Sequence, residues 1–166
     1  LYGHDGFAGE LGHLVIEPNG RECGCGRKGC LEMYVSAKGL NYTVKDYEER
    51  YPDNDFLHHK NHKNIDGKLL DHAFDNGEKI VVDIYKYTGS MLGIGLSQIS
   101  KILSPEAFIF YGGISNARHR ILDFAKVSMN ANRSSYQKDE IKILLSELSD
   151  GEAGILGASC LNRLKD

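Results

Sequence analysis

The chain has 166 residues, of which 41% are hydrophobic and 26% are charged, and its formal net charge is −3. These values are ordinary for a soluble globular domain, and a chain of this length can bury roughly two-thirds of its unfolded surface around one core. The acidic balance argues against a surface that binds a nucleic-acid backbone, and no apolar run approaches the roughly 20 residues needed to span a membrane.

The chain begins with a glycine-rich segment in which glycine recurs at every third position from Gly3 to Gly12. The repeat is too short for collagen, so it predicts a tight loop, because glycine tolerates the positive φ angles that let a backbone approach a ligand closely. The first residue is Leu1 rather than methionine, and no secretory leader pattern opens the chain. We therefore expect a segment upstream of the loop and a cytoplasmic protein.

Residues 13–32, here named the cysteine loop, begin with a short predicted strand at 14–16 and a turn at 18–20, and the cysteines come after these. The loop contains one histidine and three cysteines at the spacing of zinc ligands, namely His13, Cys23, Cys25 and Cys30. In a reducing compartment, cysteines this close in sequence are metal ligands more often than disulfides. Three thiolates and one imidazole complete a closed tetrahedral shell, so the pattern predicts a structural zinc site.

Two carboxylates, Glu10 and Glu32, lie at the two ends of this ligand set. From the residues alone, we favour a solvated loop acid for Glu10 and, for Glu32, an acid in a first helical turn that complements the helix dipole. The fourth cysteine, Cys160, lies in a distant apolar stretch, where we expect a buried small hydrophobic residue.

Helical periodicity begins after the cysteine loop. Apolar residues between Leu31 and Leu40 predict a helix that continues loosely through Tyr47. Residues 51–65 are polar and aperiodic, which predicts a surface loop, and the histidines in it are more simply explained by solvation than by a metal.

Two further helices are expected before the first buried strand. One runs from residue 66 to a stop at Asn76-Gly77, and a longer one runs from about Glu78 to Leu103 and ends before Pro105. Glycines 89 and 93 near the middle of the longer helix would let another element approach it closely.

The last third of the chain alternates between strands and helices. Residues 107–111 predict a buried strand, Gly112-Gly113-Ile114-Ser115 lead into a helix that ends near Met129, residues 141–145 predict a second strand, and residues 151–164 a closing helix. This alternation predicts an α/β architecture with parallel strands.

The double-glycine turn has two interpretations. Gly112 and Gly113 follow a predicted parallel strand, where their backbone N–H groups and the next helix N-terminus could bind the phosphates of a nucleotide. The alternative is a sharp bend with Ser115 as the helix N-cap.

Taken together, four motifs carry a family resemblance. They are Gly9-Glu10-Leu11-Gly12-His13, then Cys23 to Glu32 with its Cys-x-Cys-Gly-x-x-Gly-Cys-x-Glu pattern, then Gly112 to Ser115, then Gly151 to Ala158. In order and spacing they resemble the ROK family of bacterial sugar kinases and sugar-responsive repressors, over nearly the whole chain. The resemblance implies that residues 1–166 are the helix-rich carboxyl-terminal lobe of a two-lobed, actin-like (ribonuclease H-like) ATPase with a zinc-binding loop, its amino-terminal lobe being absent.

The resemblance also implies roles for single residues. His13, Cys23, Cys25 and Cys30 would bind the structural zinc, while Glu10, His13 and Glu32 would hold sugar hydroxyls and Gly112 and Gly113 would bind the nucleotide. Relatives often have a third glycine before this pair, where Tyr111 stands here. That difference puts the approach of the backbone to the adenosine in question.

For the intact protein, the resemblance implies an ATP-dependent, glucokinase-like kinase that uses ATP and Mg²⁺ to phosphorylate a hexose or N-acetylhexosamine. The family's catalytic aspartate and phosphate loop have no match in these 166 residues. We therefore expect no catalytic residue in this chain and no kinase activity from it alone. The alternative is the effector-binding lobe of a ROK repressor, the only case in which a nucleic-acid partner is expected. A homodimer is expected, no membrane partner is, and the sugar is not identified.

Overall fold

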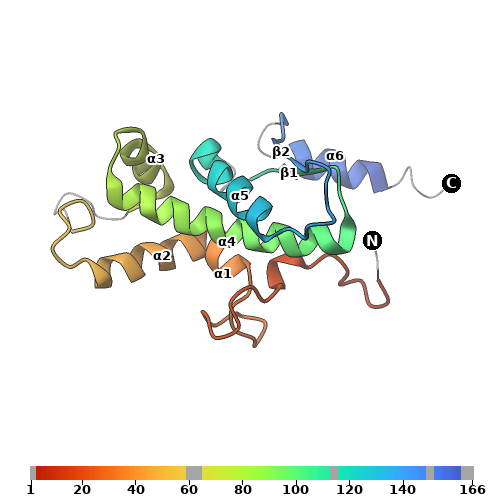
Figure 1. Cartoon of the computed structure of the whole chain (residues 1–166), viewed down its shortest axis with the longest axis horizontal. Helices are drawn as coiled ribbons and strands as arrows, with labels where there is room; N and C mark the ends of the chain where they lie inside the picture. The colour runs from red at the N-terminus through yellow and green to blue at the C-terminus, as the bar shows by residue number, and fades with distance from the viewer. Residues whose placement is uncertain (1–2, 59–64, 113–115, 149–151, 162–166) are drawn as a thin grey trace.

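One long helix, α4, runs through the middle of the molecule and the other elements are arranged around it (Figure 1). The structure is a computed structural model, and it describes residues 3–58, 65–112, 116–148 and 152–161. The elements in chain order are η1 (Leu11–His13), α1 (Glu32–Val35), α2 (Ala37–Arg50), α3 (Gly67–Asp75), α4 (Lys79–Leu103), β1 (Ala107–Phe110), α5 (His119–Asn132), β2 (Lys142–Leu145) and α6 (Glu152–Leu161).

The predicted α/β architecture with parallel strands is confirmed, although the sheet in the described residues has two short strands. Strands β1 and β2 pair in parallel, with Ala107 opposite Lys142 and Phe110 opposite Leu145. The predicted helices around residues 66–76 and 78–103 are also confirmed, as α3 and α4.

The strand predicted at residues 14–16 is wrong. In the described part of the chain this segment makes only an isolated bridge between Val15 and Cys30. The N–H groups of Ile16 and Glu17 both donate to the carbonyl of Gly29, at 2.9 and 3.3 Å, so the segment is bound to the far end of the cysteine loop instead of extending a ladder.

Two predicted helix boundaries are also wrong. The helix predicted from Leu31 through Tyr47 is broken at Ser36, whose backbone is extended and whose hydroxyl caps α2 by accepting from the N–H of Gly39. The helix after the glycine turn begins at His119, with Arg118 rather than Ser115 as its N-cap. Ser115 itself lies outside the described residues.

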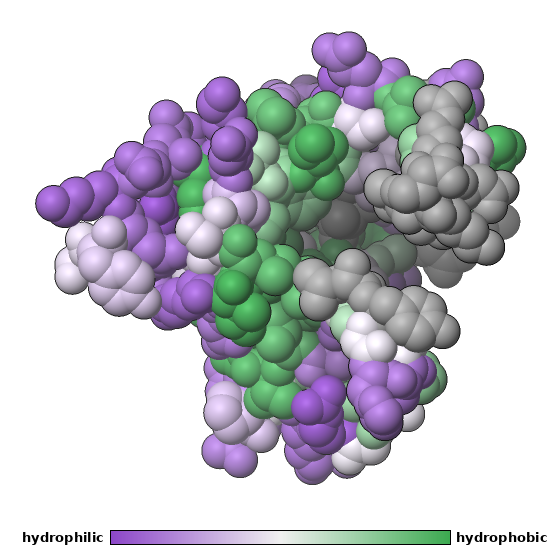
Figure 2. Space-filling view, turned by 90° about the vertical axis from the view of Figure 1, so that its right-hand side faces the viewer, coloured by the Kyte–Doolittle hydropathy of each residue, from purple (hydrophilic) through white to green (hydrophobic). Residues whose placement is uncertain are grey.

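The prediction that Cys160 is buried is wrong as well, because its side chain is exposed on α6. Within the described part of the chain, neither hydrophobic cluster contains a residue of α6. Large apolar side chains are exposed on α6, on the strands and at the end of α4, among them Ile155, Ile109, Leu144 and Ile102. Hydrophobic residues gather around a hollow on the face that carries these elements (Figure 2).

Two hydrophobic clusters form the core. The larger joins side chains of α2, α3, α4 and α5, and the smaller joins the cysteine loop to α4 through residues that include Cys30, Leu31 and Met91. No helix in the described ranges is long and apolar enough to cross a bilayer.

Helix α4 meets α5 at backbone distance, as its glycines predict. A Cβ placed on Gly89 would lie 2.6 Å from the carbonyl oxygen of Ile121, and one on Gly93 would lie 2.5 Å from that of Ala125. The hydroxyl of Ser128 donates to the carbonyl of Ser90 at 2.8 Å, which fixes the register of the two helices.

An ion pair joins α3 to the start of α5. The guanidinium of Arg120 binds both carboxylate oxygens of Asp75, at 2.8 and 2.5 Å, and lies 3.8 Å from Asp71. Asp71 in turn accepts from the hydroxyl of Tyr85 on α4 at 2.8 Å. Three helices therefore meet through one arginine.

We predict that Gly93→Ala destabilises the fold by about 1–3 kcal/mol, because the added methyl group overpacks the contact with α5. The matched control is Gly154→Ala on α6, where an added Cβ meets nothing within 4 Å. That exchange should stabilise the helix by about 0.5–1 kcal/mol. Urea unfolding followed by circular dichroism measures both, and equal shifts of the two midpoints would contradict the prediction.

We also predict that Asp75→Asn changes how stability depends on pH. The hydrogen bond from Arg120 is the main reason that the pKa of Asp75 is lowered. Because the folded pKa lies below the unfolded value of about 3.9, the pair stabilises the fold above that pH and its contribution is lost as the pH falls further. The variant should therefore be less stable than the wild type near neutral pH.

The difference should shrink as the pH falls below about 4. Urea unfolding over a pH series measures it, with Asp55→Asn as the control, since Asp55 is exposed and has no ion pair among the described residues. A difference between wild type and Asp75→Asn that is constant down to the lowest pH would refute the assignment.

Candidate functional site

The cysteine loop is shaped by backbone hydrogen bonds and by glycines with positive φ. The N–H of Cys23 donates to the carbonyl of Arg27 at 2.8 Å, and that of Gly29 donates to Arg21 at 2.8 Å. Gly29 has φ +74°, and a Cβ there would overlap the carbonyl of Glu17. Only glycine fits this position, so the turn itself requires the glycine that precedes Cys30.

The structure brings the four predicted metal ligands together. One ligand atom each from His13, Cys23, Cys25 and Cys30 lies within 4.8 Å of all the others. The Sγ atom of Cys23 is 3.5 Å from Nδ1 of His13, and those of Cys25 and Cys30 are 3.5 Å apart. A tetrahedral zinc with bonds of about 2.0–2.3 Å separates its ligand atoms by roughly 3.5–3.8 Å. The donor set and its spacing fit zinc.

The thiols of the cluster have different electrostatic surroundings. The pKa of Cys25 is lowered to about 6, first by the backbone N–H of Arg27 and then by its side chain. A hydrogen bond from the backbone of Cys25 lowers the pKa of Cys23, but contact with Glu32, burial and the other thiols outweigh it and raise that pKa to about 12. Burial raises the pKa of Cys30. Cys25 is thus the thiol that ionises most readily.

Two of the three predicted sugar-binding residues lie side by side. Glu32 is the first residue of α1, and its Oε1 accepts from Sγ of Cys23 at 3.0 Å and lies 3.4 Å from Nδ1 of His13. Both side chains keep part of their surface in solvent, 30% for His13 and 40% for Glu32. An imidazole and a carboxylate therefore face solvent together at the edge of the cluster.

Glu10 lies one turn away from this pair. It precedes η1 and its carbonyl accepts from the N–H of His13 at 3.1 Å. A Cβ on Gly12 would lie 3.5 Å from Cβ of Glu32, so η1 runs directly against the start of α1. The glycine-rich segment thus holds Glu10 and His13 on one short turn beside Glu32.

Arg21 is a residue that sequence analysis did not identify. Its guanidinium donates to the carbonyls of Met33 and Gly39, at 2.8 and 2.9 Å, and binds Thr43 and Asp46 at 3.0 and 2.6 Å. It therefore ties the cysteine loop across the break between α1 and α2. A lone arginine in a polar turn carries no signal for this role, because two of its partners are backbone carbonyls on either side of the break and the other two are side chains of α2.

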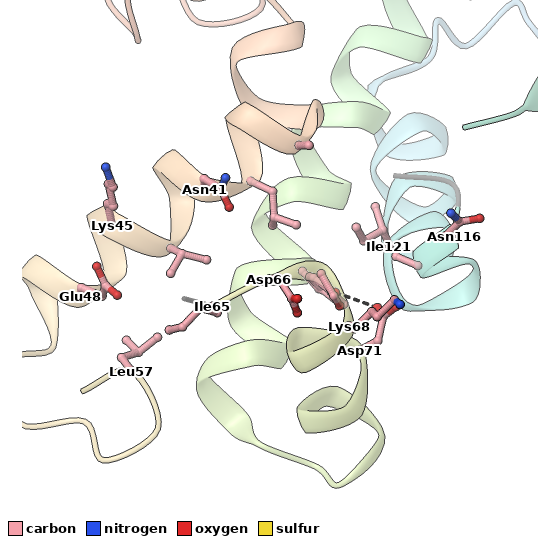
Figure 3. Close-up of a pocket in the computed structure, with 16 residues that line it drawn as sticks. Asn41, Lys45, Glu48, Leu57, Ile65, Asp66, Lys68, Asp71, Asn116 and Ile121 are labelled. Carbon is pink, nitrogen blue, oxygen red and sulfur yellow. Dashed lines mark hydrogen bonds between the residues drawn. The ribbon is translucent and has the colours of Figure 1, made fainter. Parts of the chain in front are cut away.

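A cavity of about 820 Å³ lies between α2, α3, α4 and the start of α5 (Figure 3). Side chains reach it from α2 on one side, from α3 below, and from the segment that leads into α5 on the other (Figure 3). Its polar lining residues include Asn41, Lys45, Glu48, Asp66, Lys68 and Asn116. No sequence motif marked this cavity, because its walls come from separate helices.

Two residues that line the cavity come shortly after the glycine turn in sequence. Asn116 and Ala117, which line it, follow Gly112 by four and five positions. Gly112 has φ +96°, a conformation that favours glycine. Gly113, the other predicted nucleotide-binding residue, lies outside the described residues.

Comparison with known proteins identifies the family. The model of the ROK family matches residues 1–164. The chain is 30% identical to a glucokinase of Streptomyces coelicolor, covering 99% of this chain and 53% of that protein. It is 29% identical to the xylose repressor of Bacillus subtilis, covering 96% of this chain and 38% of that protein.

A solved structure gives the same result. The chain resembles a ROK family glucokinase from Streptomyces griseus, solved with glucose and AMPPNP, with a TM-score of 0.83 and 30% identity over 99% of this chain and 54% of that one. The chain spans about half the length of these kinases. Its helix-rich α/β fold, its motifs and its match to the family model lead to one conclusion: this chain belongs to the ROK family.

Proposed function

We propose that the intact protein is an ATP-dependent sugar kinase and that this chain is its carboxyl-terminal lobe. The observation that carries the proposal is the pairing of Glu32 with His13, 3.4 Å apart and open to solvent at the edge of the thiol cluster. The similarity to glucokinases, one of them solved with glucose and AMPPNP, supports it.

In this proposal the cysteine loop holds a structural zinc ion. Cys23, Cys25, Cys30 and Nδ1 of His13 would supply four ligands, which fill a tetrahedral shell and leave no position for substrate. When bound, the metal contributes folding free energy and fixed geometry rather than reaction chemistry. His13 would then be held rigidly beside the first turn of α1.

Sugar binding falls to Glu10, His13 and Glu32. A carboxylate accepts hydrogen bonds from two hydroxyl groups and so fixes the orientation of a sugar ring. Ligation of Cys23 and of Nδ1 of His13 would use the groups that now contact Glu32, leaving Oε1 of Glu32 for a hydroxyl of a hexose or N-acetylhexosamine.

The nucleotide would bind at a different place on the chain from the sugar. The cavity between α2, α3 and α5 has the volume of an ordinary small-molecule site and would take the adenosine of ATP. The phosphates of ATP, with Mg²⁺, would bind at Gly112 and Gly113, and Gly112 has the positive φ that lets a backbone approach an anion closely. The base that activates the sugar hydroxyl would come from residues outside this chain.

A second candidate function is the effector-binding lobe of a sugar-responsive repressor. The similarity to the xylose repressor favours it. The same three side chains would then bind an inducer sugar, and residues outside this chain would contact DNA. The two functions differ in turnover rather than in sugar binding.

We predict that the purified chain carries one zinc ion and loses stability when a strong chelator removes it. Structural zinc in small peptides contributes about 10–16 kcal/mol, which is comparable with the stability of a whole domain. Elemental analysis gives the stoichiometry and thermal unfolding gives the change. Cys30→Ser should abolish binding, whereas Cys160→Ser should not, because Cys160 lies on α6 outside the cluster. An unchanged melting temperature after confirmed metal loss would contradict this.

We further predict that the intact protein releases ADP with at least one member of a hexose and N-acetylhexosamine panel, whereas the isolated chain does not. Glu32→Gln should lower kcat/KM for the sugar by about 10- to 100-fold, the value of a hydrogen bond to a charged group. Glu22→Gln is the matched control, because Glu22 is an exposed acid of the same loop that pairs with Lys28. Sugar binding by calorimetry without turnover would favour the repressor, and turnover by the isolated chain would refute its assignment as an inactive lobe.

A further inference from the structure

Two adjacent basic residues of the cysteine loop have different partners. The Nη2 atom of Arg27 donates to the backbone carbonyl of His13 at 2.9 Å. The Nζ atom of Lys28 lies 3.3 Å from Oε1 of Glu22, out along the loop. Both side chains are exposed, so the two residues differ in their contacts and not in their burial.

The charge of Arg27 also acts on the thiol cluster. Its guanidinium interacts electrostatically with Cys25, Cys30 and Cys23. The residue that donates to the main chain of the ligand histidine therefore also brings a positive charge to the ligand sulfurs. A guanidinium donates in fixed directions from a planar group, which the ammonium of lysine does not do.

The charge of the proposed metal site explains why a cation beside it would be stabilising. Three thiolates and one divalent cation leave a net charge of −1, and a neighbouring cation neutralises it. Groups that hydrogen-bond metal ligands orient them, and their loss typically weakens metal binding 10- to 100-fold. The carbonyl of His13 is one end of the residue whose ring lies 3.5 Å from Cys23 and 3.4 Å from Glu32. The hydrogen bond from Arg27 to that carbonyl therefore restricts the position of the His13 ring.

We infer that Arg27 is a positioning residue of the zinc site, which fixes His13 against the cluster by donating to its carbonyl. The inference rests on the proposed zinc site and adds to it a residue that is neither a metal ligand nor a sugar ligand. Lys28 has no such role, although it is the next residue and carries the same charge.

The test compares zinc affinity of the wild-type chain with that of Arg27→Gln, Arg27→Lys and Lys28→Gln, each measured by competition with a chromophoric chelator. We expect Arg27→Gln to bind zinc about 10-fold or more weakly and Lys28→Gln to stay within about twofold of the wild type. Arg27→Lys should fall between them, because it keeps the charge but lacks the planar guanidinium that donates to the carbonyl of His13.

Cobalt substitution supplies a readout that general loss of stability would not give. The absorption bands of Co²⁺ in a thiolate and imidazole shell report its geometry, so Arg27→Gln should shift or broaden them at full metal occupancy, whereas Lys28→Gln should reproduce the wild-type spectrum. Far-ultraviolet circular dichroism of the metal-loaded variants checks that they are folded.

The outcomes separate the two claims. A wild-type chain that binds no zinc refutes the zinc site, and the role of Arg27 falls with it. Tight binding by the wild type with equal affinity and spectrum for Arg27→Gln overturns the role of Arg27 alone. Equal losses for Arg27→Gln and Lys28→Gln also overturn it, because they indicate general charge rather than contact. Full affinity in Arg27→Lys refutes the need for a guanidinium at this position.

Discussion

The contact between α4 and its neighbours is the constraint on which the rest of the structure depends. Gly89 and Gly93 bring α4 against the backbone of α5, while Gly95 makes room for the side chain of Leu31 from the cysteine loop, which would lie 2.7 Å from a Cβ at that position. The first contact fixes one wall of the cavity, and the second fixes the start of α1. The positions of the cavity and of the cysteine loop thus both depend on α4, and a shift of that helix would displace both.

The elements that could be predicted from the sequence are those whose signals are local. The spacing of His13, Cys23, Cys25 and Cys30 identified a cluster that the structure brings together, because the four residues lie within one short loop. The long periodic stretch of α4 and the apolar runs of β1 and β2 were found for the same reason. Glycines at positions 89 and 93 indicated close packing before the partner helix was known.

What the sequence could not show depends on contacts between distant segments. The break at Ser36 arises because a serine cap competes with a continuous apolar period. Cys160 is exposed because apolar composition does not tell which element covers a helix. The cavity has no motif, since α2, α3 and α5 each contribute only part of its wall. In each case the decisive partner lies far away in the sequence.

Helix α2 contacts Arg21 on one face and lines the cavity with another. The guanidinium holds Gly39, Thr43 and Asp46, whereas Asn41, Lys45 and Glu48, offset by two positions along the same helix, line the cavity. A residue in the cysteine loop therefore sets the position of a cavity wall that it does not touch. Substitutions in the cysteine loop therefore act beyond the thiol cluster. They can also change the width of the cavity on the other side of α2.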